Sequence, residues 1–313
     1  MKTALIFPGQ GSQTVGMGKA LYDNFAVARE VFDEVDAALS EKLSDVVFAG
    51  PQEILTLTEN AQPAIMATSM AALRVLQAEA GFDIATQASY VAGHSLGEYS
   101  ALCAAGSISL TETARLLRVR GRSMQQAVPI GKGAMAALLG VDYEQAAVFA
   151  KEAAQGEICS VANDNAAGQV VISGTRAAVE RAMEIAKANG VKRAVMLDVS
   201  APFHCDLMAP AAGVMHQALG AATINAPIVP LVANVTAAEV TDPETIRQLL
   251  VDQVTGMVRW REIQTYLAAQ GVQRVIEIGA GKVLTGLAKR ITPDVATVNI
   301  GTPEDMQAFV RVE

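Results

Sequence analysis

Apolar runs of strand length and longer stretches with helical periodicity alternate along most of the chain. Runs typical of buried strands lie at residues 3–7, 90–92, 229–233, 274–278 and 295–300. Helical periodicity is clear at residues 27–42 and 62–80. Because strands alternate with helices toward both ends of the chain, the pattern predicts an α/β fold with a mostly parallel sheet, similar to that of the α/β hydrolases.

The pattern changes in the middle of the chain. An apolar run at residues 135–140 is followed by helical stretches at 142–154 and 176–189 and by strand-like runs at 158–163, 169–173 and 194–199. The resulting order, β-α-β-β-α-β, is typical of a ferredoxin-like unit. We therefore expect a large α/β catalytic domain of residues 1–130 and 200–313, with a small ferredoxin-like domain of residues 131–199 inserted in it. A cleft between the domains is the expected ligand site.

The segment Gly93-His94-Ser95-Leu96-Gly97 matches the G-x-S-x-G pattern of a nucleophile elbow. In such an elbow a strand turns sharply into a helix and holds the serine at the apex in a strained conformation. A strand-like run before the segment and a helical stretch after it provide the context that the motif requires. The backbone N–H of Leu96 would then point toward a developing oxyanion. An ordinary glycine-rich turn is the alternative, because so short a motif also occurs by chance.

A serine hydroxyl needs a base near neutral pH, and histidine is the usual base. The chain has three histidines. His94 is adjacent to Ser95 and should leave the turn in another direction, and His216 lies in an alanine-rich helical stretch. His204 follows a strand-like run, where side chains face a cleft, so it is the favoured base. A structural histidine in a loop is the alternative.

No Asp or Glu between Ser95 and His204 stands out as the third member of a hydrolase triad. Asp198 and Asp206 lie near His204 in the sequence, but neither is an obvious partner. We therefore expect a serine–histidine dyad whose imidazole is held by a backbone carbonyl or an amide. Cys205 is a rival nucleophile in principle, but it lacks an elbow and is expected to be a small buried residue.

Two further segments bear on substrate binding. The glycine-rich loop at residues 9–13 lacks a nucleotide fingerprint, because Thr14 and Met17 replace the required glycine and lysine. This loop can instead supply a second oxyanion-hole N–H, from Gln10. The arginines at positions 115, 118, 120 and 122 are typical of a solvated helical face, although one of them could point inward and hold a carboxylate with two parallel hydrogen bonds.

Composition narrows the classes of function. The chain has 32 acidic and 24 basic residues and a formal net charge of -8, which argues against affinity for nucleic acid or anionic membranes. Its three cysteines are far apart in the sequence, which indicates neither disulfides nor a zinc site and predicts a cytoplasmic location. The first eight residues are too weakly apolar for a signal peptide, and charges interrupt every long apolar stretch, so no membrane span is expected.

Taken together, the motifs resemble those of the malonyl-CoA:acyl carrier protein transacylases of fatty acid synthesis, nearly from end to end. The shared segments occur in the family's order at residues 7–13, 93–98, 120–121, 162–165, 202–205 and 277–279. The resemblance implies that Ser95 is the nucleophile and His204 the base. It also implies that the N–H groups of Gln10 and Leu96 form the oxyanion hole and that Arg120 binds the malonyl carboxylate.

The resemblance extends to two more residues. Gln253 falls where the family places the residue that supports the catalytic histidine. Phe203 resembles the malonyl-selecting form of its motif in related polyketide acyltransferases, where larger branched acyl groups go with another residue. Both residues are therefore expected to line the site.

The activity that the resemblance implies is transfer of a malonyl group from coenzyme A to the phosphopantetheine thiol of an acyl carrier protein, by a ping-pong mechanism through an ester on Ser95, without a metal or redox cofactor. Because carrier proteins are acidic, docking is expected at the basic pairs Lys192-Arg193 and Lys289-Arg290. A serine thioesterase or esterase on the same elbow is the alternative enzyme, and the intact dyad disfavours a non-catalytic carrier-binding module.

Overall fold

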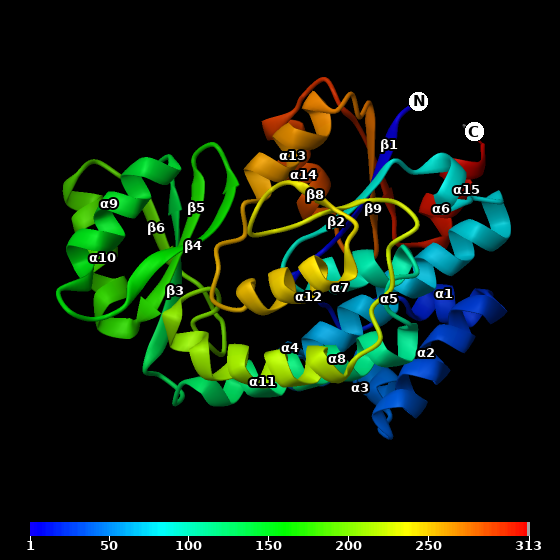
Figure 1. Cartoon of the computed structure of the whole chain (residues 1–313), viewed down its shortest axis with the longest axis horizontal. Helices are drawn as coiled ribbons and strands as arrows, with labels where there is room; N and C mark the ends of the chain where they lie inside the picture. Colours follow the sequence, from blue (N-terminus) through cyan, green and yellow to red (C-terminus); the bar gives the residue numbers. More distant parts are fainter. Residues whose placement is uncertain (312–313) are drawn as a thin grey trace.

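The chain forms two β-sheets, each with its own helices (Figure 1). The computed structural model describes residues 1–311, so residues 312 and 313 of the expected large domain lie outside the described part. The six-stranded sheet, sheet A, has the order β10-β9-β1-β2-β7-β8, and the four-stranded sheet, sheet B, has the order β4-β5-β3-β6. The strands of sheet A are β1 (Thr3–Phe7), β2 (Tyr90–Gly93), β7 (Leu231–Val232), β8 (Glu239–Val240), β9 (Arg274–Ile278) and β10 (Ala296–Ile300).

Sheet A is parallel except where β8 pairs antiparallel with β7, which confirms the expected α/β class. Side chains alternate between its two faces. Leu5 and Phe7 of β1 pack in a hydrophobic cluster with the helices of one face, whereas Ala4 and Ile6 pack in a second cluster with the helices of the other. A strand buried on both faces has a continuous apolar sequence, which is why residues 3–7 could be recognised.

Helices cover both faces of sheet A (Figure 1). Those that contribute to the first cluster are α2 (Ala26–Leu39), α3 (Leu43–Ala49), α4 (Gln52–Thr56), α5 (Thr58–Ala80), α6 (Ile84–Gln87), α7 (Leu96–Ala104), α8 (Leu110–Ala127), α11 (Ala209–Ala221), α12 (Pro243–Asp252) and α15 (Pro303–Val310), together with the short α1 (Lys19–Asn24). The opposite face carries α13 (Trp260–Ala269) and α14 (Val283–Ile291). Within residues 1–311, none of the helices combines the length and apolar character that crossing a bilayer requires.

Sheet B is antiparallel throughout and has the predicted order of elements. It consists of β3 (Gly133–Leu139), α9 (Tyr143–Ala154), β4 (Cys159–Ala166), β5 (Gln169–Thr175), α10 (Arg176–Ala188) and β6 (Arg193–Met196). The last strand ends at Met196, earlier than the apolar run to residue 199 had indicated. Residues 197–199 line a cavity instead, so the apolar side chains of Leu197 and Val199 serve the site and not the strand.

Main-chain contacts join β4 of sheet B to the segment before α13 beside this cavity. Val258 donates to the carbonyl of Ala162 at 2.9 Å, and the N–H of Asp164 donates back to the carbonyl of Val258 at 3.0 Å. The carboxylate of Asp164, which is 1% exposed, pairs with Arg261 at 2.8 Å. A half-buried ion pair and two hydrogen bonds therefore fix β4 of the small sheet against α13 and the residues just before it, which pack on sheet A.

Candidate active site

The carboxyl ends of three neighbouring strands of sheet A meet at one edge. Gln10 follows β1, Ser95 follows β2 and Asn234 follows β7, and these strands are adjacent in the sheet. In open α/β sheets this edge is where ligands bind. The fold therefore gathers residues from distant parts of the chain around Ser95.

Ser95 stands at a sharp turn between β2 and α7, with φ 54° and ψ -111°. Such backbone angles are strained for a residue with a side chain and occur at nucleophile elbows. The turn is also tightly packed, since a Cβ atom on Gly93 would lie 1.9 Å from the carbonyl carbon of Gly97. Asn234 holds the turn from the neighbouring strand, because its Oδ1 accepts the N–H of Ser95 at 2.8 Å and its Nδ2 donates to the carbonyl of Gly93 at 2.7 Å.

Ser95 Oγ lies 2.8 Å from Nε2 of His204, which is 4% exposed. The other ring nitrogen, Nδ1, lies 2.9 Å from the carbonyl oxygen of Gln253 and 3.0 Å from that of Gly256. Because carbonyl oxygens only accept hydrogen bonds, Nδ1 carries the proton and Nε2 presents its lone pair to the serine. Burial, and then the nearby cation of Arg120, lowers the pKa of His204 to about 3, so the imidazole is neutral near neutral pH.

Arg120, one of two buried arginines of α8, points toward Ser95 and has 1% of its surface exposed. Its Nη2 donates to Ser95 Oγ at 3.1 Å and to Oε1 of Gln253 at 2.8 Å. Its Nη1 donates to Oε1 of Gln62 at 2.7 Å. A buried guanidinium beside the serine is suited to bind an anionic group at a fixed distance from the reacting atom.

Gln253 contacts the histidine through its main chain and not through its side chain. The side-chain Nε2 donates to the carbonyl of Ser95 at 3.0 Å and to the carboxyl group of Glu98 at 2.6 Å. Burial raises the pKa of Glu98 to about 8, so this carboxyl group is mostly protonated at neutral pH. The glutamine side chain thus connects Arg120, the elbow and Glu98, a role that the sequence did not indicate.

A cavity of about 310 Å³ opens beside the dyad. Besides Ser95, His204 and Arg120, it is lined by Gln10, Leu96 and Phe203, and by the apolar side chains of Met135, Leu197 and Val199. Leu96 is the first residue of α7, so its N–H has no acceptor within the helix. All the residues predicted for the site therefore meet at one cavity, with Gln253 directly behind Arg120.

Other polar residues singled out in the sequence lie apart from the reacting atoms. His94 leaves the elbow in another direction and contacts Asn165 at 2.8 Å through Nε2, and His216 is exposed on α11. Cys205 is buried, with Sγ 3.2 Å from the carbonyl of Pro202. Within residues 1–311, His, Cys, Asp and Glu side chains form no group of three or more that could hold a metal ion.

The four basic residues predicted to dock the carrier are exposed. Lys192 and Arg193 lie at the start of β6, and Lys289 and Arg290 lie in the last turn of α14 (Figure 1). Arg290 also donates to Oε1 of Gln169 at 2.7 Å. One pair thus lies at a strand of sheet B and the other on a helix that packs against sheet A.

Comparisons with known proteins place this site in a family. The sequence model of the protein family described as the acyl transferase domain matches residues 4–300 of this chain. This chain belongs to the acyl transferase family. It is 46% identical over 311 residues to the malonyl CoA-acyl carrier protein transacylase of Bacillus subtilis, and the match covers 99% of this chain and 96% of that protein.

Solved structures of acyl transferases have the same fold. An acyl-carrier-protein S-malonyltransferase from Bartonella henselae superposes with a TM-score of 0.97 and is 56% identical, with 100% of this chain and 99% of that chain covered. A malonyl-transacylase in complex with its type II polyketide synthase acyl-carrier protein has a TM-score of 0.96 and 42% identity, with 100% of both chains covered.

Asn234, Glu98 and Gln62 are the polar residues of this acyl transferase site that sequence reasoning missed. Asn234 follows a predicted strand directly, so its place at a strand end was the signal that could have identified it. Glu98 and Gln62 lie within helical stretches and resemble ordinary helix residues. Their contacts with Gln253 and Arg120 depend on how distant helices pack.

Proposed function

We propose that this chain is a malonyl-CoA:acyl carrier protein transacylase that supplies malonyl groups for fatty acid synthesis. The observation that carries the proposal is the buried guanidinium of Arg120, 3.1 Å from the hydroxyl of Ser95. A buried cation at this place favours an acyl group that carries its own carboxylate. The malonyltransferase names of the relatives that match nearly the whole chain support the same substrate.

In the first half-reaction His204 acts as the general base. Its Nε2 takes the proton of Ser95 Oγ while Oγ bonds to the thioester carbonyl carbon of malonyl-CoA. The N–H groups of Gln10 and Leu96 stabilise the oxyanion of the tetrahedral intermediate. When the intermediate collapses, the C–S bond breaks and the imidazolium returns the proton to sulfur, so coenzyme A leaves as its thiol.

The second half-reaction runs the same steps with the phosphopantetheine thiol of the carrier. His204 deprotonates the thiol, sulfur attacks the malonyl ester, and Ser95 recovers the proton as the ester C–O bond breaks. The carbonyls of Gln253 and Gly256 stabilise the imidazolium in both half-reactions, because they accept hydrogen bonds from its Nδ1–H. No step requires a metal or redox cofactor.

Selectivity for malonyl arises from two features of the cavity lining, one charged and one apolar. Arg120 pairs with the carboxylate, and Phe203 with its apolar neighbours limits the room for branched acyl groups. A small, mostly apolar cavity also keeps water from the ester, which favours transfer over hydrolysis.

The proposal includes the organisation of the molecule around this site. Residues 1–130 and 200–313 form the catalytic domain and residues 131–199 the inserted domain, supported by the two separate sheets. The acyl carrier protein docks at Lys192-Arg193 and Lys289-Arg290. The location is cytoplasmic, which the three unpaired cysteines support.

The experiment that tests this function follows a labelled malonyl group. The enzyme is incubated with malonyl-CoA labelled in the malonyl group and with phosphopantetheinylated carrier protein, and label is counted on the carrier and as free malonate. The proposal predicts that label accumulates on the carrier. Release of the label into water at the rate of coenzyme A release would instead identify a thioesterase.

A further inference from the structure

A line of hydrogen bonds leads from Arg120 to the loop that carries Gln10. Arg120 Nη1 donates to Oε1 of Gln62 at 2.7 Å, and Nε2 of Gln62 donates to the hydroxyl of Thr58 at 2.8 Å. The Thr58 hydroxyl donates to Oε1 of Gln10 at 2.9 Å. Gln62 and Thr58 are 1% and 0% exposed, whereas Gln10 is half-buried, so the line runs from the interior to the rim of the cavity.

The direction of each bond in this line is fixed by its neighbours. A guanidinium only donates, so the amide of Gln62 must present its oxygen to Arg120 and its nitrogen to Thr58. The hydroxyl of Thr58 donates to Gln10 and is therefore free to accept from Gln62. Without the Thr58 hydroxyl, Nε2 of Gln62 would keep only the weak acceptor Sδ of Met124, at 3.7 Å, and the amide would be held less firmly. Arg120 thus selects the oxygen of Gln62, and Thr58 holds the amide in that orientation.

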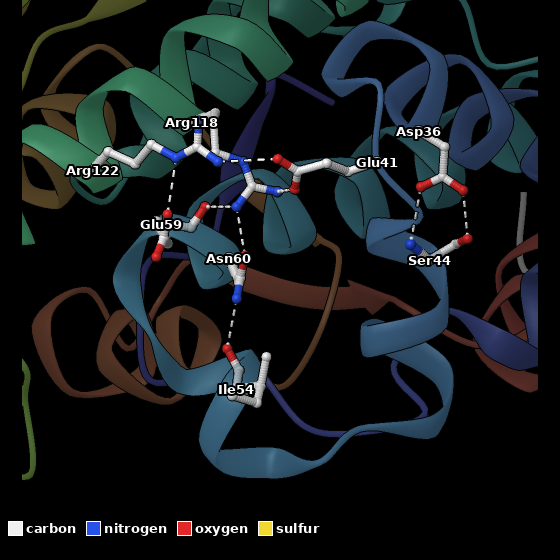
Figure 2. A network of polar contacts seen from close by, with 8 residues as sticks. All are labelled: Asp36, Glu41, Ser44, Ile54, Glu59, Asn60, Arg118 and Arg122. Carbon is white, nitrogen blue, oxygen red and sulfur yellow. Dashed lines mark hydrogen bonds and ion pairs between the residues drawn. The ribbon is translucent and has the colours of Figure 1, made fainter.

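The amino-terminal end of α5, which carries Thr58 and Gln62, is held against α8 by polar contacts (Figure 2). Pro63 has no N–H, so the carbonyl of Glu59 lacks its usual helical donor. Arg118 donates to that carbonyl at 2.9 Å, although it lies on another helix. Its side chain, 5% exposed, also bonds the side chain of Asn60.

Arg118 and Arg122 lie on either side of Arg120 in α8 and both pair with Glu41, at 2.9 and 3.0 Å (Figure 2). Gly121 lets the two helices approach, because a Cβ atom there would lie 2.5 Å from the Cα of Glu59. The position of α5 is therefore fixed by contacts outside the site. Because Gln62 and Thr58 lie on α5 and hydrogen-bond in line with Arg120, the position of α5 also determines the orientation of the Arg120 guanidinium.

We infer that Gln62 and Thr58 are positioning residues that orient Arg120 for the carboxylate of the acyl group and couple it to the Gln10 loop, so that they set the preference for malonyl over uncharged acyl groups. Neither residue needs to touch the reacting atoms. Thr58 acts through Gln62, and Gln62 acts through Arg120. The inference rests on the proposed function, because it concerns the same acyl transfer.

The test compares kcat/KM for malonyl-CoA and acetyl-CoA, with holo carrier protein as acceptor, in the full-length enzyme. Thr58→Val keeps the branched shape of the side chain and replaces the hydroxyl with a methyl group, which can neither donate nor accept a hydrogen bond. Because one buried hydrogen-bonded orientation is lost, kcat/KM for malonyl-CoA should fall about tenfold and that for acetyl-CoA by less than about threefold. Thr58→Ser restores the hydroxyl and should restore the wild-type malonyl:acetyl ratio.

Two more variants distinguish a specific effect on the malonyl:acetyl ratio from a general loss of stability. Thr68→Val removes a buried hydroxyl of the same helix, which bonds only the carbonyl of Ala64 at 3.0 Å, and should leave the malonyl:acetyl ratio unchanged. Gln62→Met removes the amide itself and should lower the ratio at least as much as Thr58→Val. If Thr58→Val is too unstable to purify, the Gln62→Met ratio decides.

The possible outcomes distinguish failure of the positioning role from failure of the proposed malonyl transfer itself. A malonyl:acetyl ratio that stays at the wild-type value in Thr58→Val or Gln62→Met overturns the positioning role, and so does a loss in Thr58→Ser as large as that in Thr58→Val. If the wild-type enzyme transfers no malonyl group at all, the proposed function fails and the inference with it.

Discussion

Removing the guanidinium of Arg120 is the most direct test of how the enzyme selects malonyl-CoA over an uncharged acyl-CoA. Arg120→Ala deletes a side chain that is 1% exposed and that donates to Ser95 Oγ at 3.1 Å. A malonyl carboxylate bound in the variant would be a buried charge without a partner. Breaking a buried ion pair in this way costs about 3–5 kcal/mol, which corresponds to a loss of about 10²–10⁴ in kcat/KM for malonyl-CoA.

An acetyl group has no carboxylate, so its transfer loses only the hydrogen bonds that Arg120 makes within the protein. Gln62 and Gln253 would each lack one donor, and water can enter the space left by the side chain. The expected loss in kcat/KM for acetyl-CoA is about tenfold or less. The malonyl:acetyl ratio should therefore fall by at least about tenfold.

The assay measures release of coenzyme A from each thioester in the presence of carrier protein. Arg115→Ala is the matched control, because Arg115 is an exposed arginine of the same helix. A second readout is the acidic limb of the pH profile of kcat/KM. In Arg120→Ala this limb should move to higher pH, because the cation of Arg120 contributes to the lowered pKa of His204 in the wild type. Equal losses for malonyl and acetyl in Arg120→Ala would refute the assignment of the carboxylate to this guanidinium.

Three further predictions follow from the same geometry. Because burial lowers the pKa of His204 to about 3, wild-type kcat/KM should stay level as the pH falls through about 6.5, the ordinary histidine value; an inflection there would contradict a neutral buried base. Asn234→Ala leaves the N–H of Ser95 without its acceptor and should lower kcat for malonyl and acetyl alike by about 10- to 100-fold, whereas a malonyl-selective loss would argue against a role at the elbow. Charge reversal at residues 192–193 and 289–290 should raise KM for the carrier about tenfold and not KM for malonyl-CoA, and unchanged carrier kinetics would exclude docking at these pairs.

The parts of the fold that the sequence predicted are those governed by local pattern. The strand before Ser95, the glycines of the elbow and the order of elements in sheet B each depend on a few adjacent residues. The dyad without an acid was also predictable, because no carboxylate of suitable position follows Ser95. His204 is indeed held by backbone carbonyls, and these come from Gln253 and Gly256.

The parts that could not be predicted depend on contacts between distant elements. Arg118 resembles a residue of a solvated face, yet it is buried because Pro63 leaves a carbonyl of another helix without a donor. Asn234 reaches the elbow only because β7 lies next to β2 in sheet A. The side chain of Gln253 bonds Arg120 and the elbow while its main chain holds the imidazole, and no local pattern distinguishes these two roles.

The central claim is that Ser95 carries the malonyl group between the two thiols. The most direct measurement is a brief incubation with malonyl-CoA in the absence of carrier, followed by acid quench, tryptic digestion and mass spectrometry. Residues 75–115 lie between consecutive tryptic sites, and this peptide should gain the mass of one malonyl group, which fragment ions assign to Ser95. Malonylation of Cys205 or of another residue, or an enzyme that stays unmodified while it releases coenzyme A, would contradict the account.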